Sequence, residues 1–185
     1  MGAAGLLLAA GQGRRYGMPK ALAERDGRRW VDLALDVLRT GGCAPLAVVI
    51  GAAAGEVRTA ATLSGALIVE NPGWAEGIGS SLRAGLDALA GTAATAAVVM
   101  LVDTPGITPA AVRRISAGAT GTTLAIATYA GQDGHPVLLG RAHWAGVAAL
   151  ATGDTGARAY LRAHPYAVRR VPCDDIATGE DVDTR

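Results

Sequence analysis

The stretch LLLAAGQGRRYGMPKAL, residues 6–22, decides which class of fold the chain is expected to adopt. An apolar run ends at Gly11, a glycine-rich turn with basic residues follows, and the chain becomes apolar again after Lys20. A short continuous apolar run is typical of a strand that is covered on both faces. If the same pattern of buried strand and turn repeats along the chain, the protein belongs to the α/β class.

The pattern does repeat. Strands are expected at residues 5–10, 46–50, 66–69, 97–102, 123–127, 136–139 and 167–171. Helices are expected between them, at residues 30–40, 54–63, 80–89, 109–117, 143–151 and 155–163, with Thr108 and Asp154 as N-caps. This alternation predicts a three-layer α/β/α fold with a mostly parallel, doubly wound sheet. In such sheets, ligands bind beyond the carboxyl ends of the strands.

Composition excludes several classes of function. The chain has 185 residues, half of them hydrophobic, which predicts one domain over residues 1–185. Its net charge of +1 provides no field that would gather nucleic acid or an anionic membrane, so neither is expected as a partner. The first apolar run is too short for a membrane span and follows no basic region, which favours a cytoplasmic location. Cys43 and Cys173 lack metal-type spacing and are expected to be reduced thiols.

The glycine-rich loop fits neither of two common phosphate-binding motifs. The dinucleotide fingerprint needs a third small residue where Tyr16 stands. A Walker A loop needs lysine directly after its second glycine, but Gly17 is followed by Met18. Both motifs are therefore weak interpretations of this loop.

The same loop still has the parts of a phosphate site. Gly11 and Gly13 allow backbone N–H groups to approach phosphate oxygens, while Arg15 and Lys20 supply positive charge. The alternative is a solvated basic turn, which is what most short charge clusters are. The position directly after the first strand and the density of glycine favour the phosphate loop.

Asp103 lies at the end of the most apolar expected strand, in VVMLVDTPGITP. A carboxylate at such a place is costly to bury unless it is paired, capped or bound to metal. It either caps the following turn or binds Mg²⁺, which prefers one or two carboxylates with phosphate and water. Its position at a carboxyl strand end favours the metal.

Two further segments carry polar residues with open interpretations. In NPGWAEGIGSSLRAGL, Ser80 and Ser81 are helix caps or part of an anion site at a helix start. In GQDGHPVLLGR, His135 is an isolated histidine, and an isolated histidine usually has a structural role. In GDTGARAYLRAHP, Arg158 either neutralises a ligand phosphate or pairs with a surface acid.

Taken together, the motifs resemble a known family. LAAGQGRRYGMPK is similar to L-A-[AG]-G-x-x-x-R-[MF]-G-x-x-K, the signature of the molybdenum-cofactor nucleotidyltransferases in the GT-A-like NTP transferase superfamily. The matching residues are Leu8, Ala9, Ala10, Gly11, Arg15, Gly17 and Lys20, and Tyr16 replaces the usual Met or Phe. The resemblance implies that the loop, Gly13 included, wraps a nucleoside triphosphate. It also implies that Arg15 and Lys20 bind the phosphates.

Later motifs extend the resemblance over nearly the whole chain. LVDTP resembles a D-x-P motif, which implies that Asp103 coordinates Mg²⁺ and takes part in catalysis. N-P-x-W-x-x-G-[MI]-x-x-S-L lines the base and ribose pocket in the family, which implies nucleotide-binding roles for Asn71, Gly77, Ser80 and Ser81. The segments G-H-P-V-L-[FL] and G-D-x-G-A-R imply that the acceptor-substrate site includes His135, Asp154 and Arg158.

The last motif lies in the polar, acidic segment after residue 173, which composition alone would present as a frayed end. It resembles [IV]-D-[TI]-P, which implies that Asp183 is a second Mg²⁺ ligand opposite Asp103. Arg185 stands where the family has proline. The metal role of Asp183 therefore rests on a less complete match than that of Asp103.

The resemblance implies transfer of a nucleotidyl group from an NTP to a phosphorylated acceptor, with release of pyrophosphate. Ala10 points to the base, because L-A-A-G is typical of cytidylyl-transferring members and L-A-G-G of guanylyl-transferring ones. The implied substrates are CTP and molybdopterin, and an apo-molybdenum hydroxylase would receive the product. The alternatives are a GTP-dependent or sugar-phosphate nucleotidyltransferase, and a non-catalytic chaperone of the molybdenum cofactor.

Overall fold

The computed structural model describes residues 2–184 and is built on a 7-stranded sheet with the order β5-β4-β1-β6-β8-β7-β9. The strands are β1 (Ala3–Ala9), β4 (Leu46–Ile50), β5 (Ala66–Glu70), β6 (Ala96–Leu101), β7 (Leu124–Tyr129), β8 (Gln132–Gly140) and β9 (Val168–Pro172). All neighbouring strands pair in parallel except β8, which is antiparallel to β6 and to β7. The prediction of a mostly parallel sheet is confirmed. The exception arises because a tight turn at Ala130 and Gly131 joins β7 directly to β8.

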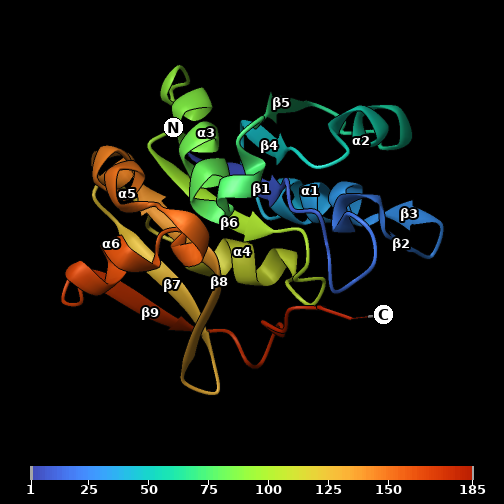
Figure 1. Ribbon diagram of the computed structural model, residues 1–185. Coiled ribbons are helices and arrows are strands. Elements are labelled where there is room, and N and C mark those ends of the chain that lie inside the picture. Colours follow the sequence, from blue (N-terminus) through green and yellow to red (C-terminus); the bar gives the residue numbers. More distant parts are fainter. Residues whose placement is uncertain (1, 185) are drawn as a thin grey trace.

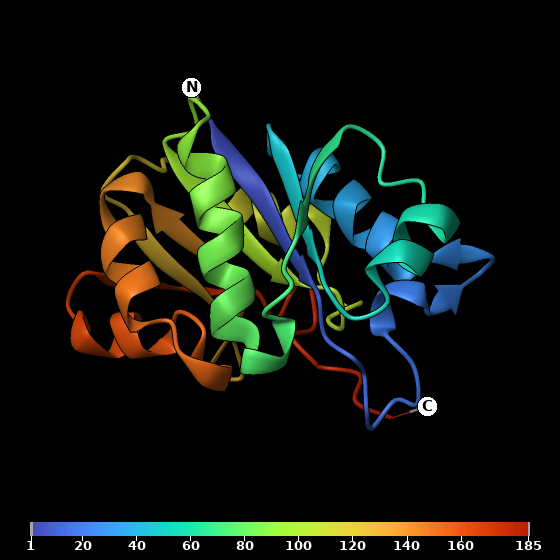
Figure 2. The same cartoon turned by 45° about the horizontal axis from the view of Figure 1, so that its top comes forward.

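Helices cover both faces of this sheet (Figures 1 and 2). They are α1 (Trp30–Thr40), α2 (Ala54–Ala60), α3 (Ile78–Ala90), α4 (Pro109–Ser116), α5 (Trp144–Leu150) and α6 (Arg158–Ala163). Short 3₁₀ turns are η1 (Lys20–Leu22), η2 (Trp74–Glu76), η3 (Arg141–His143) and η4 (Gly153–Thr155). The three-layer α/β/α architecture expected from the sequence is therefore confirmed.

The strands are apolar throughout because both of their faces are buried. In β1, Leu7 packs into the core formed with α1 and α4, while Leu6 and Leu8 pack into the core formed with α3, α5 and α6. Each fully buried leucine contributes about 1.5 to 3 kcal/mol relative to an exposed one. The two cores fix β1 in the centre of the molecule and place the loop after it at the carboxyl edge of the sheet.

One of the two expected helix caps is wrong. Thr108 is confirmed, since its side chain accepts a hydrogen bond from the Ala111 N–H at 3.3 Å. Asp154 is not a cap, because it lies inside the η4 turn and α6 begins at Arg158. Gly156 lies between the two elements with a φ of 52°, which separates them.

A small hairpin of β2 (Glu24–Arg25) and β3 (Arg28–Arg29) was not expected from the sequence. Its turn is formed by Asp26 and Gly27, both with positive φ. Asp-Gly is a preferred pair for two-residue hairpin turns, so this sequence signal was present.

The segment after β9 is docked along the loop after β6 and runs toward the N-terminal loop (Figure 1). The Thr178 N–H donates to the Gly106 carbonyl at 3.1 Å, and the Val182 N–H donates to the Asp103 carbonyl at 2.9 Å. The segment is therefore not frayed as its composition alone would suggest, because its backbone makes hydrogen bonds to the neighbouring loop. Arg185, where the family pattern has proline, lies outside the described residues. Over residues 2–184, no helix is long and apolar enough to span a bilayer.

Candidate active site

Two connected cavities lie at the carboxyl ends of β1 and β6. The first, here called the loop cavity, has a volume of about 370 Å³ and lies between the loop after β1 and the start of α3. The second, here called the α6 cavity, has a volume of about 610 Å³ and lies between β8 and α6. Both are lined by Leu8, Ile78, Leu101 and Asp154, so they form one continuous cleft.

The glycine loop has a backbone conformation that its sequence requires. Gly13 has a φ of +63°, and a Cβ at this position would lie 1.9 Å from the Met18 carbonyl oxygen. Only glycine fits there. Gly11 lines the loop cavity, and a Cβ added to it would meet no atom within 4 Å. The backbone of the loop is therefore open to a ligand in this cavity.

Lys20 is the buried cation of the site. Its side chain is 10% exposed, and its Nζ lies 2.9 Å from Asp103 Oδ2 and 3.0 Å from Asp183 Oδ1. Burial by itself lowers the pKa of Lys20, but hydrogen bonds to the two carboxylates outweigh burial and raise the pKa above its usual value. Lys20 therefore remains charged at neutral pH. It joins two residues that are 80 positions apart in the sequence.

Arg15 lies at the rim of the cavity rather than in its lining. Its Nη1 lies 2.9 Å from Asp183 Oδ2, and its side chain is largely exposed. The neighbouring Arg14 lines the loop cavity, and its Nε donates to Gln12 at 3.1 Å. The hydrogen bond from Lys20 and the charge of Lys20 lower the pKa of Asp183, and the charge of Arg15 adds a smaller effect in the same direction. Arg14, which the sequence analysis did not single out, therefore faces the cavity, whereas Arg15 does not line it.

The carboxylates of the site fit a hard divalent cation. Asp103 Oδ1 is buried and has no hydrogen-bond partner among the described residues, while Oδ2 is bound to Lys20. A buried carboxylate oxygen without a donor is costly, and a cation would satisfy it. Asp183 shares Lys20 with Asp103, so the two carboxylates lie close together.

Protein ligands alone do not complete a metal site. In the described part of the chain, no three His, Cys, Asp or Glu side chains are grouped to hold a metal ion. Mg²⁺ commonly uses one or two carboxylates and completes its coordination with phosphate oxygens and water. The sequence did not identify Asp181, whose pKa is raised by burial and by the charges of Asp103 and Asp183. The D-x-D spacing with Asp183 was the available signal.

Some polar residues around the start of α3 line the loop cavity, and others hold the turn behind it. The Asn71 side-chain amide donates to Ser80 Oγ at 2.8 Å and to Ser81 Oγ at 3.1 Å. Ser80 Oγ lies within hydrogen-bond distance of the Gly77 carbonyl, at 2.8 Å. Of these residues, only Ser81 and Gly77 line the loop cavity, together with Ala10. Asn71 and Ser80 hold the turn behind it.

Ala9 also does not reach either cavity, because it packs into the core on the other face of β1. The side chain of Asp154 lies at the junction of the cavities. A Cβ placed on Gly77 would lie 2.7 Å from Asp154 Oδ1, so this carboxylate is held against the start of α3. Ala10 and Leu8 line the cleft, whereas Ala9 faces away from it.

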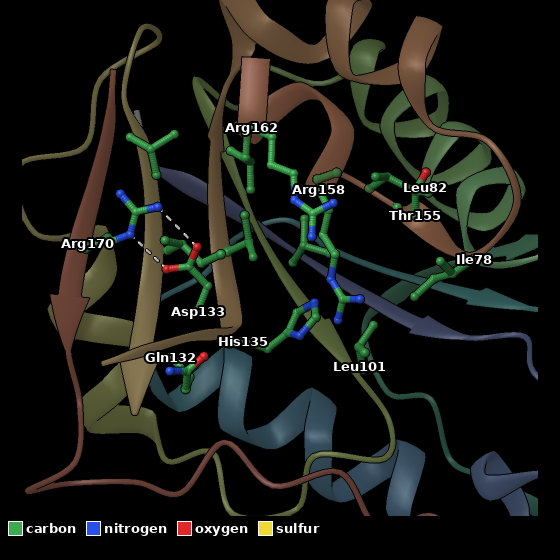
Figure 3. A pocket seen from close by; sticks show the side chains of 18 of the residues that line it. Ile78, Leu82, Leu101, Gln132, Asp133, His135, Thr155, Arg158, Arg162 and Arg170 are labelled. Carbon is green, nitrogen blue, oxygen red and sulfur yellow. Dashed lines mark hydrogen bonds and ion pairs between the residues drawn. The ribbon is translucent and has the colours of Figure 1, made fainter. Parts of the chain in front are cut away.

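The α6 cavity combines an apolar floor with cationic side chains (Figure 3). His135 lines it from β8, and Arg158 extends from α6 toward His135. Burial lowers the pKa of His135 to about 4, with Asp103 opposing this shift and Arg158 adding to it. His135 is therefore neutral at pH 7. Arg170 also lines this cavity, but it is paired with Asp133, with Nε 2.9 Å from Oδ1.

These features define an α/β protein whose glycine loop, buried lysine and strand-end carboxylate line one cleft at the carboxyl edge of the sheet. A family model described as the MobA-like NTP transferase domain matches residues 5–168. The chain belongs to this family.

Relatives that match nearly the whole chain have different names. The chain is 40% identical over 188 residues to nicotine blue oxidoreductase of Paenarthrobacter nicotinovorans, covering 97% of this chain and 91% of that protein. The crystal structure of Rv0371c from Mycobacterium tuberculosis H37Rv matches with a TM-score of 0.84 and 34% identity, covering 100% of this chain and 94% of that one. A structure of Rv0371c in complex with manganese matches with a TM-score of 0.79 and 30% identity, covering 98% and 94%. A divalent metal therefore binds a relative of similar length.

Proposed function

We propose that this protein transfers CMP from CTP to the terminal phosphate of molybdopterin and releases pyrophosphate, in the cytoplasm. The observation that carries the proposal is that the loop cavity, which Asp103 and Lys20 line, is continuous with the α6 cavity at Leu8, Ile78, Leu101 and Asp154. One cavity has an open glycine backbone, as a triphosphate requires, and the other has cationic side chains, as a phosphorylated acceptor requires. Membership of an NTP transferase family supports the reaction class.

The site residues identified from the sequence are assigned roles in this proposal. Arg15 and Lys20 neutralise the triphosphate, and the backbone of Gly11 and Gly13 approaches its oxygens. Asp103 and Asp183 would hold Mg²⁺, which would stabilise negative charge on the phosphates when bound. The nucleoside pocket is formed by Leu8, Ala10, Gly77 and Ser81, with Ala9, Asn71 and Ser80 as support.

The reaction requires the acceptor phosphate to approach the α-phosphorus of CTP in line. A bond forms between an acceptor phosphate oxygen and the α-phosphorus, while the bond from the α-phosphorus to the bridging oxygen of pyrophosphate breaks. Because the attacking oxygen is already anionic, no side chain is needed as a general base. Arg158 and neutral His135 would position the acceptor, and Asp154 would fix the junction near the start of α3.

The base preference rests on Ala10, which lines the loop cavity beside Trp74. A methyl group on the cavity wall narrows the space for the base, which favours a pyrimidine. GTP and sugar phosphates are the alternatives within the same chemistry. A non-catalytic cofactor chaperone is a further alternative, but a carrier would not require Arg15, Lys20 and Asp103 together.

The name of the relative from P. nicotinovorans favours a second candidate, an oxidoreductase. Hydride transfer would require a bound redox cofactor, and the loop after β1 departs from the dinucleotide fingerprint at Tyr16. Nucleotidyl transfer is therefore the better-supported reaction for this chain.

Pyrophosphate release distinguishes these candidates. The protein is incubated with Mg²⁺, molybdopterin and CTP or GTP, and with NADH or NADPH in parallel. We expect pyrophosphate with CTP only when molybdopterin is present, and no oxidation of either reduced nucleotide. Preferential use of GTP would overturn the base assignment. Oxidation of NADH or NADPH without pyrophosphate release would replace the proposed reaction.

A further inference from the structure

Arg162 is a cationic residue of the α6 cavity to which the proposed reaction gives no role. It lines this cavity together with Arg158, and Figure 3 shows both side chains directed from α6 into the cavity. The two residues are four positions apart, so they lie on one face of the helix, about 6 Å apart along its axis. The α6 cavity therefore contains two cations spaced along one helix, besides Arg170, which is paired with Asp133.

Neither cation is neutralised by the protein. Among residues 2–184, no carboxylate forms an ion pair with Arg158 or Arg162. Of the two carboxylates that line the same cavity, Asp133 pairs with Arg170, and Asp154 forms no ion pair with either arginine among the described residues. Like charges at positions i and i+4 destabilise a helix by a few tenths of a kcal/mol, and α6 is only 6 residues long. The pair of arginines has a cost in the unliganded protein that a bound anion would remove.

Apolar side chains form another part of the lining of this cavity. The floor of the cavity includes Leu82, Val99, Ile126, Val137 and Leu161. Such a floor binds a flat apolar body, and the few polar groups around it fix the orientation of that body.

We propose that Arg162 is a specificity-determining residue that binds a second anionic group of the acceptor, separate from the phosphate that reacts. The acceptor class is then a flat, mostly apolar molecule with a phosphate at one end and another anion roughly 6 Å away. Arg158, beside His135 and the junction, receives the reacting phosphate. This inference rests on the proposed function only for the assignment of the reacting phosphate to Arg158. The binding of a second anion by Arg162 does not depend on the reaction.

The test uses two small probes that differ by one anionic group, phenyl phosphate and 4-carboxyphenyl phosphate. Their dissociation constants are measured by calorimetry without nucleotide or metal, for the wild-type protein and for Arg162→Gln, Arg158→Gln and Arg170→Gln. Arg170→Gln is the matched control, because it removes the same charge from the same cavity but from a cation already paired with Asp133.

We expect the wild-type protein to bind the carboxylated probe about tenfold more tightly, as one additional charge-assisted hydrogen bond implies. Arg162→Gln abolishes this preference, Arg170→Gln retains it, and Arg158→Gln weakens both probes equally. No preference in the wild-type protein, or a preference that survives Arg162→Gln, would overturn the inference. No nucleotide is present in this experiment, so its result does not depend on whether the protein turns over CTP. Likewise, loss of the probe preference would not contradict the proposed CTP turnover.

Discussion

The two cavities of the cleft differ in whether their cationic side chains are paired with carboxylates. In the loop cavity, Lys20 is bound by Asp103 and Asp183, and Asp183 also pairs with Arg15. In the α6 cavity, Arg158 and Arg162 have no carboxylate partner among the described residues. Lys20 is therefore held by carboxylates of the protein, whereas Arg158 and Arg162 are exposed and can pair with a ligand. Substitution of the paired cation Lys20 should consequently affect stability, whereas substitution of the unpaired cation Arg158 should affect binding.

The largest expected effect comes from Asp103. Alanine removes the unpartnered buried carboxylate oxygen and asparagine removes its negative charge, so we expect nucleotidyl transfer to fall by about 10² to 10³ in either variant. The protein should remain folded, as measured by thermal unfolding. Asp87→Asn, a change on an exposed part of α3, serves as the control. Full Mg²⁺-dependent activity in Asp103→Ala would exclude Asp103 as a metal ligand.

The next substitution pair tests the contrast between paired and unpaired cations. Lys20→Met leaves Asp103 without its partner in a mostly buried site, and we expect a loss of about 2 to 3 kcal/mol in the free energy of unfolding. Arg158→Gln should change this free energy by less than about 0.5 kcal/mol. Urea denaturation measures both. Equal destabilisation by the two variants would contradict the division of the cleft.

His135 gives a smaller effect that depends on pH. Burial lowers its pKa to about 4, so below pH 6.5 the unfolded chain binds a proton that the folded protein excludes. The stability associated with neutral His135 is present above pH 6.5 and is lost as the pH falls toward 4, by about 1.4 kcal/mol per pH unit. The test compares urea unfolding of the wild-type protein and His135→Gln at pH 7 and pH 5. A histidine NMR titration with a midpoint near 6.5 at position 135 would refute this account.

The smallest expected effect concerns Asp183. This carboxylate pairs with both Arg15 and Lys20, so Asp183→Asn frees these two cations to bind phosphate, and we expect metal-free CTP binding to become stronger. The increase should be only severalfold, because charge pairs at exposed positions are weak. Mg²⁺-dependent turnover should decrease in the same variant. Asp181→Asn has the same change in charge but no ion pair to Lys20 or Arg15 among the described residues, so it is the control. Equal CTP affinities of the two variants would show that only overall charge matters.

Local patterns in the sequence predicted most of the fold. Continuous apolar runs marked the strands, and Thr108 with Pro109 marked the start of α4, because both signals act within a few residues. The β7–β8 reversal was not predicted, since the short apolar runs at 123–127 and 136–139 do not indicate strand direction. Asp154 was wrongly assigned as a cap because Gly156 ends the turn before α6 begins.

Local patterns pointed to single residues of the candidate site, and the resemblance paired Asp183 with Asp103, but the ion pairs of Lys20 with these carboxylates were not predicted. The order of glycines and basic residues after β1 pointed to the loop, and the end of β6 pointed to Asp103. The contact of Asp183 with Lys20 joins residues 163 positions apart, and no local pattern encodes it. The orientation of Arg162 was also hidden, because a basic residue on a short helix is usually solvated. The helix spacing from Arg158 was the only signal.

The central claim is that the α-phosphorus of a nucleoside triphosphate is transferred at this cleft. It is tested most directly by incubating the protein with Mg²⁺, molybdopterin and CTP labelled with ³²P in either the α or the γ position. The account predicts that the α label appears in the acceptor product and the γ label appears in pyrophosphate. Transfer of the γ label to the acceptor, or no transfer of either label, would contradict it.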